Sequence, residues 1–199
     1  MIPPFEPSGV LPPFLGDSPG APPNHAPYRT NVAQVAHRLG TSIERLAILE
    51  GLLEYRRRLA KLGFVKGFQW IDGSFVEDCE MRRGRPPQDV DLVTFFRRPE
   101  GAKDDDAWAT FCEEHAEALE DLFDPHRAKA LFKCDGYPVE LDFPAEAIVG
   151  QTHFWFGMFS HSREGREWKG ILQVDLFDPV ADPEAAQLVA QRRAAWSAS

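Results

Sequence analysis

The spacing of apolar residues predicts four helices in this chain. Over 43–62, apolar residues recur at intervals of three and four, which places them on one face of a helix that Ser42 can cap and Gly63 can end. The other three predicted helices are a short one from a Thr30 cap to Leu39, one over 105–123 with an acidic first turn, and a terminal one over 184–196.

Four shorter apolar segments predict β-strands. They cover 68–71, 90–96, 137–143 and 171–177. The segment 90–96 is apolar almost throughout, which is typical of a strand buried on both faces. In a chain of 199 residues, these elements predict one α/β (α+β) domain over 30–199, with a small mixed sheet flanked by helices.

Residues 1–29 differ in composition from the rest of the chain. The first 27 residues hold 9 of the 17 prolines. Because proline fixes φ and donates no backbone hydrogen bond, we expect an extended arm rather than a helix. The arm also carries Phe5, Leu11 and Phe14, which predict that it lies across the domain surface. A disordered tail is the alternative.

Charge is distributed unevenly. The formal net charge of −9 argues against a general nucleic-acid-binding or DNA-binding protein, because phosphate backbones require basic patches. Residues 31–98 nevertheless carry 12 basic and 9 acidic groups, whereas residues 99–149 carry 4 basic and 14 acidic groups. The acidic 99–149 region and the apolar arm are therefore candidate surfaces for a protein partner.

Cysteine use and hydropathy bear on the cellular compartment. The 3 cysteines are too few and too scattered for a disulfide framework or a zinc site, which favours a reducing cytosol. No signal-peptide pattern and no apolar run long enough to span a membrane is present in the sequence. We therefore expect a cytoplasmic protein that does not contact membranes.

Candidate chemistry is concentrated in the segment 69–96. Gly73 and Ser74 follow the first predicted strand, and Asp89 and Asp91 open the second. Side chains of a strand alternate between two faces, so the two aspartates point the same way. Neighbouring carboxylates repel one another unless a cation lies between them, and Mg²⁺ prefers such oxygen ligands.

A third acid is expected on a neighbouring strand. The sequence Val-Glu-Leu-Asp-Phe at 139–143 alternates, which puts Glu140 and Asp142 on one face. Asp142 is the preferred third carboxylate, and Asp135 and Glu140 are the alternatives.

The order of these motifs resembles the polymerase-beta-like minimal nucleotidyltransferase superfamily, in which a Gly-Ser turn precedes Asp-x-Asp and a distant third acid. The stretch 139–145 is also similar to a strand of oligoadenylate-synthetase-like enzymes. Over nearly its full length, the chain resembles an uncharacterised bacterial family of short nucleotidyltransferase-like proteins. The shared features are Met-Ile-Pro-Pro-Phe at 1–5, Leu-Pro-Pro at 11–13, Gln-Trp-Ile-Asp-Gly-Ser-Phe at 69–75, Gly-Arg-Pro-Pro at 84–87 and Trp-Lys-Gly at 168–170.

The superfamily resemblance implies a nucleotidyltransferase fold and a Mg²⁺-dependent site. Gly73 and Ser74 would hold the terminal phosphates of an NTP. Asp89, Asp91 and Asp142 would bind two Mg²⁺ ions, which stabilise the attacking and leaving oxygens. The implied reaction transfers a nucleoside monophosphate from an NTP to a hydroxyl of a small molecule, RNA or protein.

Basic residues outside these motifs divide into two groups. Arg85, in the loop before the aspartates, and Lys169, in the aromatic and basic segment 154–170, are candidate nucleotide-binding residues. The arginines at 56–58 are interpreted as a solvated helix face rather than a binding patch.

Two further hypotheses stand beside the enzyme. One is a catalytically silent fold that acts as a binding, antitoxin or regulatory subunit; a toxin–antitoxin or phage-defence system is a setting for either it or the enzyme. The other is a second-messenger synthase. It is less favoured because such enzymes usually carry an additional helical domain.

Overall fold

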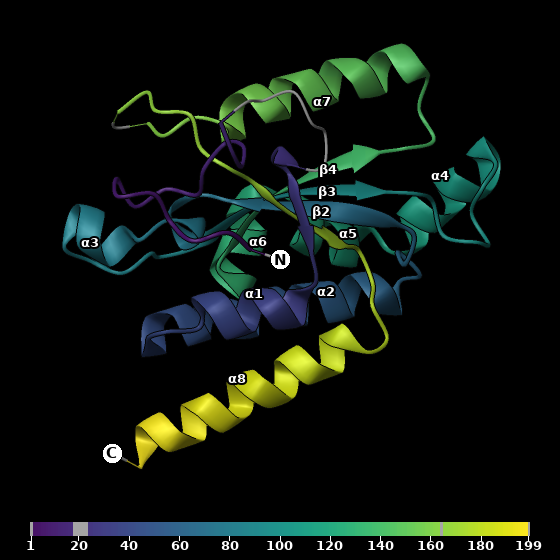
Figure 1. Cartoon of the computed structure of the whole chain (residues 1–199). Coiled ribbons are helices and arrows are strands. Elements are labelled where there is room, and N and C mark those ends of the chain that lie inside the picture. Colours follow the sequence, from purple (N-terminus) through teal and green to yellow (C-terminus); the bar gives the residue numbers. More distant parts are fainter. Residues whose placement is uncertain (1, 18–23, 164, 199) are drawn as a thin grey trace.

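A five-stranded mixed sheet forms the centre of the computed structural model, which describes residues 2–17, 24–163 and 165–198 (Figure 1). In sheet order, the strands are β1 (Tyr28–Thr30), β5 (Leu172–Asp175), β2 (Gly67–Asp72), β3 (Val90–Phe96) and β4 (Cys134–Glu140). β1 is parallel to β5, and β3 is parallel to β4, whereas β2 is antiparallel to both of its neighbours. The mixed α/β class predicted from the sequence is confirmed.

Eight α-helices accompany the sheet in the described part of the chain. They are α1 (Val32–Leu39), α2 (Ile43–Lys61), α3 (Cys79–Arg83), α4 (Asp105–Glu114), α5 (Ala116–Phe123), α6 (Pro125–Phe132), α7 (Ala145–Phe159) and α8 (Ala181–Ser197). A 3-10 turn, η2 (Ser74–Val76), follows β2. Figure 1 shows α7 alone on one side of the sheet, whereas α1, α2, α5 and α6 lie on the other side, with α8 outside α1 and α2.

The two faces of the sheet bury cores of different size. The main core lies under α1, α2 and α6, and a smaller cluster lies on the α7 side. Strand β3 contributes Leu92 and Phe96 to the main core and Val93 and Phe95 to the smaller one. This explains why its sequence is apolar except at Asp91 and Thr94, because a strand covered on both faces has no polar face.

Two predicted helices differ in detail from the structure. The N-cap of α1 is Asn31 rather than Thr30, because the Asn31 side chain accepts a hydrogen bond from the amide of Gln34 at 2.9 Å. The helix expected over 105–123 is two helices, α4 and α5. The backbone leaves the helical conformation at His115 (φ −115°, ψ 19°), whose ring stacks on Phe111.

The interpretation of the arginines at 56–58 as solvated is wrong for Arg56. Its side chain is buried, and its guanidinium bonds Asp182 Oδ1 at 2.6 Å and Gln69 Oε1 at 2.7 Å. Arg57 does remain exposed and pairs with Glu54 on the same helix. Arg56 therefore joins α2 to the first turn of α8, a contact that a local run of arginines does not reveal.

The N-terminal arm lies against the domain in the described residues 2–17. Leu11 is 1% exposed and belongs to the main core, and Phe5 packs against that core. Backbone hydrogen bonds of 2.7 Å join Gly170 N to Leu11 O and Asp78 N to Gly9 O. Residues 18–23 of the arm lie outside the described residues. No helix in the described part of the chain has the length and apolar character needed to cross a membrane.

Candidate functional site

Aspartates of three adjacent strands stand side by side at one edge of the sheet. In the pairing register, Asp72 of β2 lies opposite Asp91 of β3, and Asp91 lies opposite Asp135 of β4. Residues paired across strands point to the same face, so the three carboxylates face the same way. Asp89, two residues before Asp91, joins them. All four line a cavity of about 260 Å³.

The third acid at this edge is Asp135 and not Asp142. The strand expected over 137–143 is β4, Cys134–Glu140, and it runs parallel to β3. Because Asp91 lies at the start of β3, the acid that meets it must lie at the start of β4. Asp142 follows the other end of β4, roughly 20 Å from Asp135 at about 3.3 Å per residue.

Both carboxylates at that far end are engaged by arginines. Asp142 accepts hydrogen bonds from Arg97 Nη1 at 2.6 Å and from the backbone amide of Arg98 at 2.8 Å. Glu140, the other alternative, is buried and bonds the Arg98 guanidinium at 2.6 Å. The structure therefore brings Asp89 and Asp91 together with Asp135, but not with Asp142 or Glu140.

Burial and mutual repulsion perturb the acids of the cavity. Desolvation raises the pKa of Asp91 to about 6, and the negative charges of Asp89 and Asp135 act in the same direction. Desolvation also raises the pKa of Asp72 to about 7, although the nearby Lys169 ammonium opposes the shift. The Oδ1 atom of Asp72 is buried and has no hydrogen-bond partner among the described residues.

Two lysines supply positive charge to this cluster. The Lys129 ammonium lies 2.5 Å from Asp89 Oδ2 and 3.7 Å from Asp135 Oδ2, and the hydrogen bond to Asp89 is the main cause of its raised pKa. Lys169 is only 4% exposed and lies 3.0 Å from Asp72 Oδ2. Burial acts to lower the pKa of Lys169, but its acidic partners outweigh burial and the pKa is raised.

Gly73 brings the backbone close to the acid row, which consists of Asp72, Asp89, Asp91 and Asp135. It has φ 80° and ψ −165°, and a Cβ atom at this position would lie 1.8 Å from Asp91 Oδ2. Only glycine permits both the positive φ and this close approach. Ser74 then begins η2 and lines the same cavity, as does Arg85 from the following loop. The residues predicted at the Gly-Ser turn are thus beside Asp91.

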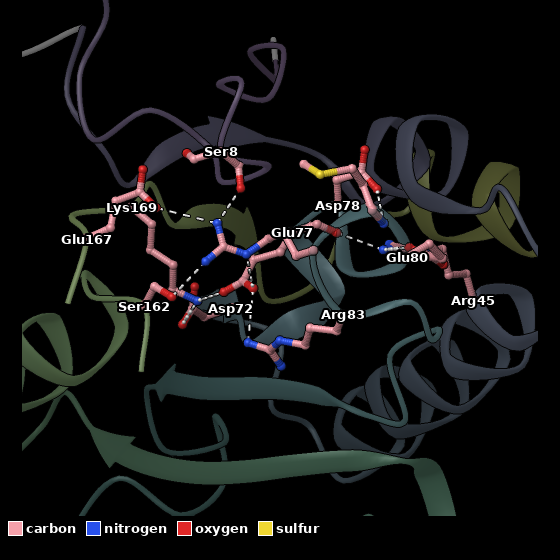
Figure 2. A network of polar contacts seen from close by, with 12 residues as sticks. Ser8, Arg45, Asp72, Glu77, Asp78, Glu80, Arg83, Ser162, Glu167 and Lys169 are labelled. Carbon is pink, nitrogen blue, oxygen red and sulfur yellow. Dashed lines mark hydrogen bonds and ion pairs between the residues drawn. The ribbon is translucent and has the colours of Figure 1, made fainter. Parts of the chain in front are cut away.

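A buried ionic network holds the segment after the turn (Figure 2). Glu77 is 2% exposed and lies 3.0 Å from Lys169 Nζ and 3.2 Å from Arg83 Nη2. From α2, Arg45 donates to the carbonyl oxygens of Phe75 and Glu77 at 2.8 and 2.7 Å. Lys169, expected to contact nucleotide, is therefore a buried link between Asp72 and Glu77, although it also lines the cavity.

Aromatic side chains from β4 and α7 line the same cavity as the acids. Tyr137 of β4 and Trp155 of α7 have ring centroids 4.4 Å apart, and both line the cavity together with Met158 and Phe159. The Trp155 Nε1 donor is buried and has no partner among the described residues. An unpaired buried donor of this kind gains free energy when a bound molecule supplies an acceptor.

The acids of the cavity could provide oxygen ligands for a metal ion. Among the described residues, no group of three or more His, Cys, Asp or Glu side chains is arranged to hold a metal ion. At the acid row, the Lys129 ammonium lies next to Asp89, in a position that a metal ion bound to this carboxylate would need. The carboxylate oxygens of Asp89, Asp91 and Asp135 suit Mg²⁺ by chemistry, provided that Lys129 moves away from Asp89.

Sequence reasoning did not identify Lys129. It lies in α6, a helix that was not predicted. The signal for this helix was present, since Asp124 caps it by accepting from the amide of Arg127 at 2.9 Å and Pro125 occupies its first turn.

Comparison with known proteins identifies the family without assigning an activity. No curated protein and no solved structure matches the chain. The model of a family of unknown function, DUF6932, matches residues 3–175, which is most of the sequence. The chain therefore belongs to the DUF6932 family.

Proposed function

We propose that this protein is a Mg²⁺-dependent nucleotidyltransferase with a polymerase-beta-like fold. It would transfer a nucleoside monophosphate from an NTP to a hydroxyl acceptor. The observation that carries the proposal is the row of Asp72, Asp91 and Asp135 across three adjacent strands, directly beside the Gly73 turn. Carboxylates on neighbouring strands next to a close backbone approach are what metal-assisted phosphate chemistry requires.

The acids at this edge would hold the metal. Asp89, Asp91 and Asp135 are the ligands, with Asp135 in the role expected of Asp142. When bound, Mg²⁺ would neutralise charge on the triphosphate and stabilise the attacking and leaving oxygens. Asp72 lies opposite Asp91 in the pairing register and is already engaged by Lys169 at 3.0 Å, so it is not assigned as a ligand.

The rest of the cavity suits a nucleotide. Gly73 lets the backbone approach the phosphates closely, and the Ser74 hydroxyl can donate to them. Arg85 and Arg163 line the cavity and supply positive charge for the phosphates. From α7, Trp155 can stack on a base, and its unpaired Nε1 can donate to an acceptor of the nucleotide.

A catalytically silent binding subunit is the second candidate. The observation that favours it is the neutralisation of the acids within the chain, by Lys129 on Asp89 at 2.5 Å and by Lys169 on Asp72 at 3.0 Å. A fold that had lost its metal would need such internal cations to keep the acid row stable.

Labelled nucleotides separate the two candidates. The protein is incubated with Mg²⁺ and each of the four α-labelled NTPs, with and without cell extract, tRNA and protein fractions. The proposal predicts a labelled product and released pyrophosphate, both lost in Asp91→Asn and retained in the matched variant Asp142→Asn. Absence of labelled product with every nucleotide and acceptor pool favours the silent subunit.

A further inference from the structure

Helix α7 is the most apolar helix in the described part of the chain, and most of its positions are exposed. Between 147 and 160 its sequence contains no Asp, Glu, Lys or Arg. The stripe that the domain covers most is formed by the buried or half-buried positions Ile148, Thr152, Trp155 and Phe159. These positions follow the helical repeat of 3.6 residues, so they describe a single face. The other positions of α7 are exposed, although the Phe156 ring lies 6.2 Å from that of Trp70 and lines a cavity together with Pro13 and Phe14 of the arm.

Large apolar side chains lie on both flanks of this stripe. Val149 is 67% exposed and Phe156 is 40% exposed on one flank, while Phe154 at 54% and Met158 at 52% lie on the other. Figure 1 shows that no other helix covers α7 on its outer side. A helix that is apolar on nearly all sides is normally buried, and exposed apolar patches commonly mark interaction sites.

Between these flanks, the face of α7 that points away from the sheet carries two glycines. Gly150 and Gly157 are seven residues apart and therefore share the face that points away from the sheet. A Cβ atom built on either glycine would meet nothing within 4 Å. Another helix can therefore approach the backbone closely here, with the flanking side chains packing on either side of it.

We propose that α7 pairs antiparallel with α7 of a second copy of this chain to form a two-fold symmetric dimer. With Gly150 of one copy opposite Gly157 of the other, the two-fold symmetry brings Glu146, in the first turn of α7, to the end of α7 of the second copy, where His161 follows the helix. Both of these residues are exposed in the single chain. Because the centre of α7 carries no Asp, Glu, Lys or Arg, the two copies meet there without like-charge repulsion. At each end of the helix pair, an acid of one copy lies near a base of the other.

The exposed area is sufficient for such a dimer. Trp168, which shares a cavity with Phe156, is 63% exposed, and Phe143, two residues before α7, is 51% exposed. Six half-exposed side chains, each of which could bury roughly 100 Å², give roughly 600 Å² per copy and roughly 1,200 Å² in total. That total lies at the lower end of the range for stable protein–protein interfaces. This inference does not depend on the proposed function.

Solution mass tests the dimer. Sedimentation equilibrium of the full chain between about 1 and about 200 µM, a range chosen for a small interface, should show a concentration-dependent shift from one chain mass to two. Phe154→Glu should leave a monomer over the whole range. Val180→Glu, 72% exposed at the start of α8, is the matched control and should still dimerise. A monomer at every concentration, or equal loss in both variants, would overturn the proposal.

Cross-linking tests the antiparallel register. The symmetry axis passes between residues 153 and 154, so His153→Cys should form a disulfide between copies under mild oxidation. Gln191→Cys, exposed on α8, should not. Cross-linking of both variants to the same extent, or of neither when the sample is dimeric, would contradict this pairing. The parent protein, whose Cys112 is the one partly exposed cysteine among the described residues, gives the background.

Discussion

The two ends of β4 carry acids in opposite electrostatic environments. At its start, Asp135 meets Asp91, whose pKa is raised to about 6 by desolvation and by neighbouring acids. Beyond its end, desolvation acts to raise the pKa of Asp142, but hydrogen bonds from the Arg98 amide and from Arg97 outweigh it, and the pKa is lowered. The first end gathers four aspartates, which two lysines accompany, whereas the acids of the second end are paired with arginines.

This contrast separates the proposed metal site from structural ion pairs. Arginine is always charged and bonds carboxylates with a fixed fork, so it suits permanent pairs such as Arg98 with Glu140. Acids that repel one another lower stability, and such perturbed groups are typically found at functional sites. The location of an acid relative to arginines therefore distinguishes Asp135 from Asp142 better than strand periodicity does.

The largest expected effect on stability comes from the arginine end. Arg98→Met removes the partner of Glu140, which is 8% exposed, and should lower the free energy of unfolding by about 3 kcal/mol. Arg97→Met is the control. Because Arg97 is 54% exposed and pairs with the partly exposed Asp142, its loss should cost less than about 1 kcal/mol. Urea unfolding of both variants measures the difference. Equal losses of unfolding free energy would contradict the distinction between the buried pair at Glu140 and the exposed pair at Asp142.

At the acid end, the effect on stability should have the opposite sign. The folded-state pKa of Asp91, about 6, lies above its ordinary value of 3.8, so its ionisation costs stability as pH rises from about 4 to about 7. In EDTA, Asp91→Asn should therefore raise the free energy of unfolding by about 2 kcal/mol at pH 8 and leave it nearly unchanged at pH 4.

Asp142→Asn provides the converse control for that measurement. A lowered folded-state pKa contributes stability that is present above the unfolded pKa and lost as pH falls, so this variant should be less stable than the parent at pH 8. The difference should vanish in acid. A stabilised Asp142→Asn, or a destabilised Asp91→Asn, at pH 8 would contradict the assignment of the two ends.

The smallest expected effect is a change in Mg²⁺ affinity, caused by removing Lys129, the lysine that pairs with Asp89. Lys129→Met removes an ammonium that is 51% exposed and bonded to Asp89, and Mg²⁺ should bind up to about fivefold more tightly as a result. Lys103→Met, at an exposed pair remote from the row, should leave Mg²⁺ affinity unchanged. Calorimetric titration with Mg²⁺ alone measures both. Weaker binding in Lys129→Met would mean that Lys129 supports the site rather than competing for it.

Local patterns predicted those parts of the fold in which burial is continuous. β3 was predicted over its full length, because 90–96 is apolar on both faces. The Ser42 cap was also correct, since its side chain accepts from the amide of Arg45. Capping and two-sided burial are determined within a few residues, so the sequence shows them directly.

The bounds of β4 could not be predicted from local sequence patterns. The strand contains Gly136 and Pro138, which interrupt the alternation that the following residues 139–143 display. In the structure, Gly136 makes room for Tyr55, since a Cβ there would lie 3.1 Å from the Tyr55 hydroxyl. Pro138 is tolerated because β4 is an edge strand. The register of β4 is set by its pairing with β3, and the paired residues are distant from one another in the sequence.

Mg²⁺-dependent nucleotide binding by Asp135→Asn and Asp142→Asn tests which of the two aspartates belongs to the proposed metal site. The two variants make the same chemical change at opposite ends of one strand, and binding of each Mg²⁺·NTP is measured by calorimetry for both and for the parent. The account predicts that Asp135→Asn weakens Mg²⁺-dependent binding by at least about tenfold, about 1.4 kcal/mol, whereas Asp142→Asn binds like the parent. Loss of binding in Asp142→Asn with retention in Asp135→Asn would contradict it.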